Sequence, residues 1–202
     1  MNEIIGTFIM FFAVIDPIGT VPVFIAVTSR YENQVKRKIA VKAALISAIV
    51  LIFFVVAGEV ILTALKISLS AFQIAGGIVL FLFALSMIFG ESKPEEEVEM
   101  AISGSETAIF PIAVPSIASP GAMLAAVLLT ENNRYNILEQ AQTTAIMLFV
   151  LLIVLVLMLA ASRVHRLIGS SGASVISRVM GLILASVAVT GVLAGIKGYF
   201  SL

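Results

Sequence analysis

The sequence predicts an all-α, polytopic membrane protein with six transmembrane helices arranged as two inverted three-helix repeats, in which helices 1 and 4 are broken at mid-membrane. Three observations support this fold class: a very apolar composition, six apolar windows of bilayer length, and a proline-containing interruption that occurs once in each half. Of the 202 residues, 60% are hydrophobic and 12% are charged, whereas soluble domains carry about 25% charged residues. The composition therefore indicates an integral membrane protein.

Each of the six windows contains at most one charged residue and is about as long as a bilayer-spanning helix. They cover residues 4–29, 43–65, 67–90, 107–130, 140–162 and 179–196. We expect residues 1–90 to form the first three-span repeat and residues 107–202 the second. Residues 91–106, which are rich in Glu, are expected to form an acidic cytoplasmic linker within one membrane domain.

The first window is interrupted near its centre by Asp16, its only charged residue, and by Pro17. Asp is a preferred N-cap and Pro is favoured at the first helical position, so this pair predicts the start of a new helix. Pro17 also disfavours helical geometry at the residue before it, which predicts that the preceding helix ends by Ile15. Gly19 and Pro22 are expected to loosen the following turn. Because a carboxylate at the membrane centre is costly, Asp16 indicates a functional site, the alternative being a purely structural cap.

The fourth window has a matching interruption at Ser119 and Pro120. Asp16 and Ser119 are 103 positions apart, and Gly77 and Gly181 of the third and sixth windows are 104 apart. A register of 98, which aligns the prolines differently, fits the glycines less well. Because each half has an odd number of spans, the two copies insert upside down relative to each other. Inverted repeats with matched broken helices indicate a secondary transporter with a midplane site.

The distribution of basic residues predicts the orientation. Nine of the twelve Lys and Arg residues lie after the first, third and fifth windows, and three lie on the other side. By the positive-inside rule, both termini are outside a cell (inner or cytoplasmic) membrane, and the acidic central segment does not alter this because acids count for little.

Two helix N-termini that meet at mid-membrane present partial positive charge and free N–H groups, which suit a carboxylate or another small anion. The Asp16 side chain adds a negative charge for an ammonium group or a proton, so a zwitterion such as a small amino acid satisfies both. The predicted substrate-binding residues are Asp16, Pro17, Gly19, Thr20, Gln73, Ser116, Ser119, Pro120 and Gly121.

The sequence allows two roles each for Glu59 and Gln73, and it predicts a packing role for several glycines. Asp16 and Glu59 are the candidates for proton coupling, but Glu59 is near the outer end of its window, where its carboxylate can instead reach headgroup water. Gln73 either hydrogen-bonds across helices or faces the cavity. Small residues favour close helix packing, which we expect at Gly76, Gly77, Gly181, Gly191 and Gly195.

Three segments in register, residues 12–24, 71–77 and 110–122, resemble the signature segments of the MarC family, and the resemblance covers essentially the whole chain. Some members of that family transport small neutral amino acids. The resemblance implies a six-span, proton-coupled transporter of the glycine and alanine class. Two positions depart from the family pattern: Thr20, where Asn is frequent, and Ser119, where Gly usually precedes Pro-Gly.

Alternative functions can be weighed against the composition. The family name, which refers to multiple antibiotic resistance, suggests a drug or metabolite efflux protein or a small-solute channel as the alternative. An enzyme is not expected: the chain has a single Asp for an aspartyl dyad, and Ser116 and Ser119 have no His or Lys in the windows to act as a base. With one His and no Cys, no metal site and no cofactor are expected. The expected partners are a small amino acid, a proton or other coupling ion, and the bilayer; nucleic acid is not expected at zero net charge.

Overall fold

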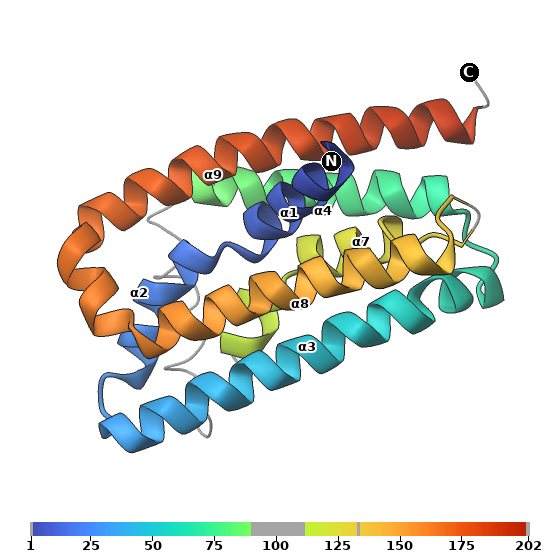
Figure 1. Cartoon of the computed structure of the whole chain (residues 1–202). Coiled ribbons are helices and arrows are strands. Elements are labelled where there is room, and N and C mark those ends of the chain that lie inside the picture. Colours follow the sequence, from blue (N-terminus) through green and yellow to red (C-terminus); the bar gives the residue numbers. More distant parts are fainter. Residues whose placement is uncertain (1, 90–111, 133, 201–202) are drawn as a thin grey trace.

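A computed structural model describes residues 2–89, 112–132 and 134–200, and the regular structure in these ranges is helical (Figure 1). The elements in chain order are α1 (Asn2–Ile15), α2 (Pro17–Thr28), α3 (Asn33–Ala64), α4 (Leu69–Phe89), η1 (Ile112–Ile117), α7 (Pro120–Leu128), α8 (Ile137–Leu159) and α9 (Ala161–Tyr199). The predicted acidic linker, residues 91–106, lies outside the described residues.

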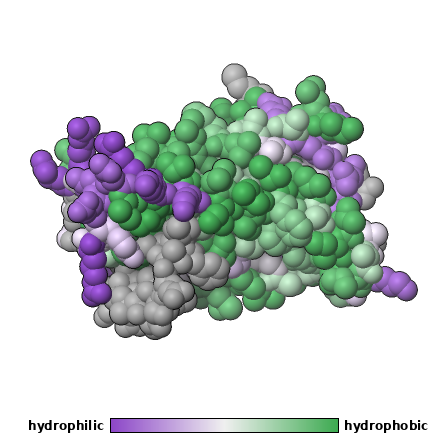
Figure 2. Space-filling model, turned by 90° about the horizontal axis from the view of Figure 1, so that it is seen from below, coloured by the Kyte–Doolittle hydropathy of each residue, from purple (hydrophilic) through white to green (hydrophobic). Residues whose placement is uncertain are grey.

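Five helical segments in the described ranges are long and apolar enough to cross a membrane: Glu3–Thr28, Asn33–Ala64, Leu69–Phe89, Ile137–Leu159 and Ser174–Tyr199. They correspond to five of the six predicted windows. The remaining window, residues 107–130, begins outside the described residues and continues as η1 and α7. Apolar side chains cover the middle of the face in Figure 2, and hydrophilic residues gather at its two ends. The all-helical, membrane-embedded class of the prediction is therefore confirmed.

Two helices begin earlier than the hydropathy windows do. The first turns of α3, from Asn33 to Lys42, are helical, although their basic residues place them outside the apolar window. The predicted loop after the fifth window is also helical, because α9 begins at Ala161 and is interrupted only at Gly169, which has φ 67°. Lys and Arg are good helix formers, and glycine adopts positive φ without steric cost. Hydropathy therefore marks the apolar part of these helices but misses their polar ends.

Close packing between α4 and α9 depends on small residues. A Cβ at Gly77 would lie 3.1 Å from the Ala188 carbonyl oxygen, and a Cβ at Gly181 would lie 3.0 Å from that of Ala84. Gly195 likewise approaches the backbone of α4, and Gly76 lies against Leu124 of α7. The antiparallel helices α4 and α9 can approach this closely because no side chain separates their backbones at the glycines.

Gly191 differs from the other predicted packing glycines. A Cβ built there would meet no atom of another element within 4 Å among the described residues. The expected packing role at Gly191 is therefore corrected, because this glycine is on a face of α9 that no described neighbour approaches closely.

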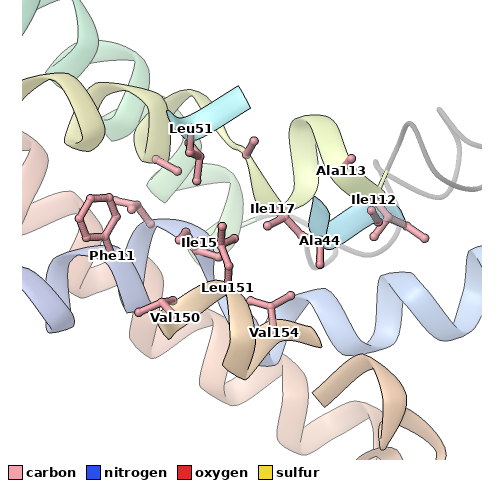
Figure 3. Close-up of a cluster of buried hydrophobic side chains, with 14 of the residues drawn as sticks. Phe11, Ile15, Ala44, Leu51, Ile112, Ala113, Ile117, Val150, Leu151 and Val154 are labelled. Atoms are coloured by element: carbon pink, nitrogen blue, oxygen red, sulfur yellow. The ribbon is translucent and has the colours of Figure 1, made fainter. Parts of the chain in front are cut away.

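The core surrounds the two interrupted segments. Of the five candidate spans, Glu3–Thr28 is the most enclosed, with 61% of its apolar window buried against 22–33% for the others. Figure 3 shows Phe11 and Ile15 of α1 and Ile117 of η1 among residues of α3 and α8, including Leu51 and Leu151. The broken segments thus lie inside the bundle, where backbone groups freed by a break can be satisfied by protein.

Candidate functional site

The first break is built on Asp16, which ends α1 and also caps α2. Its backbone is left-handed (φ 50°, ψ 68°), a conformation that Asp tolerates better than most residues. Its amide donates to the Phe12 carbonyl (3.0 Å), and its side-chain Oδ1 accepts from the Gly19 amide (2.9 Å). The Asp16 side chain is 1% exposed. The helix start predicted at Pro17 is therefore present, with its cap buried.

The turn after this break is not loosened as the sequence suggested. α2 continues without interruption from Pro17 to Thr28 with Pro22 inside it. Thr20 reinforces the first turn, because its hydroxyl donates to the Asp16 carbonyl oxygen (2.9 Å). Pro22 removes one backbone donor, and the packing of the half-helix tolerates that single loss.

The second break is built on Ser119, which precedes α7. Its backbone is extended (φ −72°, ψ 159°), and its hydroxyl accepts from the Ala122 amide (3.2 Å). Pro120 is the first residue of α7, as the sequence predicted. The preceding turn η1 is irregular, because Val114 leaves helical geometry (φ −140°, ψ 122°).

A hydrogen bond joins the two breaks. The Ser119 hydroxyl donates to the carbonyl oxygen of Val14 at the end of α1 (2.8 Å). In an unbroken helix this carbonyl would accept from the amide of Ile18, and the break at Asp16 removes that partner. Ser119 is fully buried, so its hydroxyl replaces a backbone bond that neither water nor lipid would supply.

Each helix of the first interrupted segment packs against one part of the second. α1 packs against α7, and α2 packs against η1, so the two interrupted segments run in opposite directions past each other (Figure 1). The Ser47 hydroxyl of α3 adds a further tie, because it is within hydrogen-bond distance of the carbonyl oxygens of Ala43 (2.8 Å) and Ala113 (3.1 Å). The irregular turn is thus held by a neighbouring helix.

Glycines occupy the tightest points of both breaks. A Cβ at Gly19 would collide with the Asp16 carboxylate as it is placed here, so the glycine leaves room for this carboxylate to reach the Gly19 amide. A Cβ at Gly121 would meet the end of the Leu80 side chain, 2.5 Å away, and the Val14 side chain at 3.5 Å. The two predicted glycines therefore differ in what they accommodate: a carboxylate at the first break and a flexible leucine at the second.

The first turn of each half-helix contains an amide that has no acceptor within its own helix. The first amides of a helix have no intrahelical acceptor; Pro17 and Pro120 have no N–H, and the caps bind Gly19 and Ala122. The amides that remain at the second helical position are those of Ile18 and Gly121. With the positive ends of both helix dipoles, they give the site the means to bind a small anion beside the Asp16 carboxylate.

Other predicted site residues are placed differently. Ser116 is fully buried on η1, one turn before Ser119. Gln73 is not at the level of the breaks: Gly121 lies against Leu80 of α4, and Gln73 is seven residues earlier on α4, about 10 Å of helix rise away. We therefore group Ser116 with the breaks and leave Gln73 out of the central site.

Glu59 lies near the end of α3 and binds the loop between α7 and α8. Its Oε2 accepts from the Asn132 amide (2.8 Å), and Asn132 Oδ1 accepts from the side-chain amide of Gln140 (3.1 Å). This network holds the connection between α7 and α8 at the end of the bundle. Among the described residues, no three His, Cys, Asp or Glu side chains come together as metal ligands.

Two contributors to the site are not among the residues that the sequence singles out. The Ser47 hydroxyl contacts η1 across 66 positions of chain, so no local pattern could indicate it. The Ile18 amide could have been found, because any helix that begins with Pro leaves its second amide without a partner inside the helix.

Comparison with known proteins places this chain in a family. Residues 1–200 match the family model described as "MarC family integral membrane protein". The chain is 34% identical over 197 residues to the UPF0056 inner membrane protein YhgN of Escherichia coli, covering 98% of both chains. It is 34% identical over 201 residues to a UPF0056 membrane protein of Methanocaldococcus jannaschii (98% of both). It is also 32% identical over 200 residues to one of Buchnera aphidicola (99% of both).

No solved structure matches the chain at a significant level. The family match extends over nearly the whole length and includes the three segments that carry the resemblance seen in the sequence. This protein therefore belongs to the MarC family of integral membrane proteins.

Proposed function

We propose that this protein is a secondary transporter of small neutral amino acids of the glycine and alanine class, coupled to protons, and that it binds its substrate between the two helix breaks. The observation that carries the proposal is the buried junction itself. At each of two helix N-termini, a capping residue is followed by Pro. The Ser119–Val14 hydrogen bond links these two termini beside the Asp16 carboxylate.

The proposal includes two inverted three-helix repeats, with the breaks at mid-membrane. Reciprocal contacts support it. Gly77 lies against Ala188 and Val192, and Gly181 lies against Ala84 and Ile88. The two sets of contacts correspond, because Gly77 and Gly181, Ala84 and Ala188, and Ile88 and Val192 are each 104 positions apart. Contacts that exchange in this way are expected when two copies of one unit pack around a two-fold axis in the membrane plane.

The chemistry of the junction suits a zwitterion. We assign the substrate carboxylate to the Ile18 and Gly121 amides, at the positive ends of α2 and α7. The ammonium group then faces the carboxylate of Asp16, the only charged residue of the apolar window 4–29. Such a ligand brings its own compensating charges, which lowers the cost of burying either group alone.

The surroundings favour a small substrate. Ala13, Ala118 and Ala122 are all buried next to the capping residues, and the caps themselves are fully enclosed. A large or aromatic side chain would have to displace these packed residues, whereas glycine or alanine adds little volume. Because Asp16 and Ser119 are buried, the described conformation is closed around the junction, and transport requires another conformation that opens it.

Membrane location and orientation belong to the same proposal. The Escherichia coli relative YhgN is named an inner membrane protein, and we place this chain in the corresponding membrane with both termini outside. The basic residues support this orientation: the segment from the end of α2 into α3 and the start of α9 carry most of the Lys and Arg residues, which the positive-inside rule assigns to the cytoplasm.

The test is uptake of radiolabelled glycine, L-alanine and L-leucine into proteoliposomes. We expect saturable uptake of glycine and alanine by the wild type, little uptake of leucine, and loss of uptake in Asp16→Asn. Glu131→Gln is the matched control, because it removes a carboxylate from the loop between α7 and α8 and should leave uptake unchanged. Wild-type uptake by Asp16→Asn would contradict the proposed site.

Proton coupling has its own measurement. An imposed inward proton gradient should increase alanine accumulation above the level reached without a gradient. Accumulation that is independent of the gradient would remove the coupling while leaving the carrier proposal intact. Single-channel currents across planar bilayers would favour the channel alternative instead.

A further inference from the structure

A cavity at one end of the bundle lies outside the proposed amino-acid site. It has a volume of about 350 Å³ and is bounded by the end of α2, the start of α3, the end of α8 and the start of α9. In Figure 1 these four ends meet at the left of the molecule, and hydrophilic residues gather at the same end of the face in Figure 2. Its size is within the range of small-ligand sites. We call it the basic cavity.

The polar part of this cavity is positively charged. Lys36 and Arg37 reach it from α3, and Arg163 reaches it from α9. Among the described residues that line it, none is acidic; Glu32, which precedes α3, is not in the lining. The first turn of α3 adds the partial positive charge of a helix N-terminus, and the Glu32 side chain makes no capping bond to its amides. The cavity therefore offers three cations to a ligand.

The rest of the lining is apolar. Phe24 and Ile25 of α2 and Met158 and Leu159 of α8 form these walls. Phe24 and Met158 are almost fully buried, whereas Leu159 is 48% exposed on the outer surface. A ligand held by the cations can thus continue along an apolar surface that leads out of the bundle toward lipid.

The depth of the cavity matches that of lipid headgroups. From Asp16 to Thr28, which lines the cavity, the chain follows all 12 residues of α2, or about 18 Å of helix rise. Half of the hydrocarbon core of a bilayer is about 15 Å thick. With Asp16 at the midplane, as proposed above, the cavity lies at the level of the phosphate groups, on the side that the positive-inside rule makes cytoplasmic.

We propose that the basic cavity binds the headgroup phosphate of an anionic phospholipid. The ammonium of Lys36 and the guanidinium groups of Arg37 and Arg163 neutralise the phosphate, and the apolar walls receive the glycerol and the first part of the acyl chains. Basic pockets between transmembrane helices on the cytoplasmic side bind such headgroups through this chemistry. Free phosphate would use the cations alone and gain nothing from the apolar walls.

The test measures thermal unfolding of the purified protein in neutral detergent, titrated with phosphatidylglycerol, phosphatidylcholine or inorganic phosphate. The cavity variant replaces Lys36, Arg37 and Arg163 with Gln. The control variant replaces three exposed cations outside the lining, two on α3 and one on α9, namely Lys38→Gln, Lys42→Gln and Arg178→Gln. Both variants lose the same charge, so a general surface effect changes them equally.

We expect phosphatidylglycerol, but not phosphatidylcholine, to raise the melting temperature of the wild type and of the control variant. Since each Lys or Arg near an anionic headgroup changes affinity about five-fold, the cavity variant should need roughly 100-fold more phosphatidylglycerol for the same shift. Equal shifts in both variants, or no preference for phosphatidylglycerol, would overturn the site. A shift reproduced by millimolar inorganic phosphate would overturn the lipid assignment. This readout is independent of amino-acid uptake, so its failure is distinguishable from failure of the proposed transport.

Discussion

The two helix breaks share a backbone plan and differ in one side chain. In each, a capping residue is followed by Pro, and the cap accepts a bond from an amide three residues later. At the first break the cap is the Asp16 carboxylate, and at the second it is the Ser119 hydroxyl. A hydroxyl can accept one hydrogen bond and donate another, and the Ser119 hydroxyl donates to the Val14 carbonyl of the other break.

This difference separates two tasks that a broken membrane helix must perform. Ser119 closes the structure, because it satisfies a carbonyl that the first break leaves without its helical partner. A neutral cap would also bind the Gly19 amide, so under the proposed function Asp16 is the residue that adds a charge for the substrate ammonium group. The comparison therefore separates the role of Ser119 in joining the two breaks from the proposed role of Asp16 in binding substrate.

The largest expected effect comes from crowding the first break. Gly19→Ala places a Cβ against the Asp16 carboxylate, and it should lower the free energy of unfolding by about 3 kcal/mol, the upper part of the range for overpacking. Gly121→Ala is the matching change at the second break and should cost less, because the Leu80 side chain can rotate away. Thermal unfolding in detergent measures both variants.

Gly191→Ala is the control for this pair, because its Cβ meets no atom of another element within 4 Å among the described residues. It should leave stability unchanged or raise it slightly, since Ala is the better helix former. If Gly121→Ala proves more damaging than Gly19→Ala, the first break is not the tighter of the two.

The next effect comes from removing the link between the breaks. Ser119→Ala loses the α7 cap and leaves the Val14 carbonyl without the Ser119 hydroxyl, so the free energy of unfolding should fall by about 2 kcal/mol. Ser186→Ala is the control, because that exposed hydroxyl bonds only within its own helix, to Leu182 (3.0 Å). Equal small losses in both variants would show that the Ser119–Val14 bond contributes little.

The parts of the fold that the sequence predicts are those governed by local chemistry. Asp-Pro and Ser-Pro indicate helix starts because capping and the geometry of Pro act within a few residues. The apolar windows locate the spans because hydropathy, too, depends only on the residues within each window. Pro22 shows the limit of a local rule: it predicted a loosened turn, whereas α2 continues through it because the half-helix is packed along its length.

What could not be predicted depends on contacts between distant segments. Neither the Ser119–Val14 bond nor the Ser47–Ala113 bond has a local signal, since each crosses more than 60 positions of chain. Gln73 was grouped with the site on residue type, but its level along α4 is set by how that helix packs on α7 and α9. The sequence therefore identifies the chemical groups of the junction, and only the packing shows which of them meet.

The smallest effect on stability should separate the two roles of Asp16. Asn keeps a side-chain oxygen for the Gly19 amide and tolerates the left-handed backbone at this position, so Asp16→Asn should change the free energy of unfolding by less than about 1 kcal/mol. Asp16→Ala loses the cap and keeps the strained backbone, and should cost about 2 kcal/mol. Thermal unfolding and alanine uptake, measured for the wild type, Asp16→Asn and Asp16→Ala, distinguish the structural role of Asp16 from its proposed role in binding. If Asp16→Asn is as unstable as Asp16→Ala, the charge itself is structural, and the loss of uptake in Asp16→Asn no longer identifies a substrate-binding group.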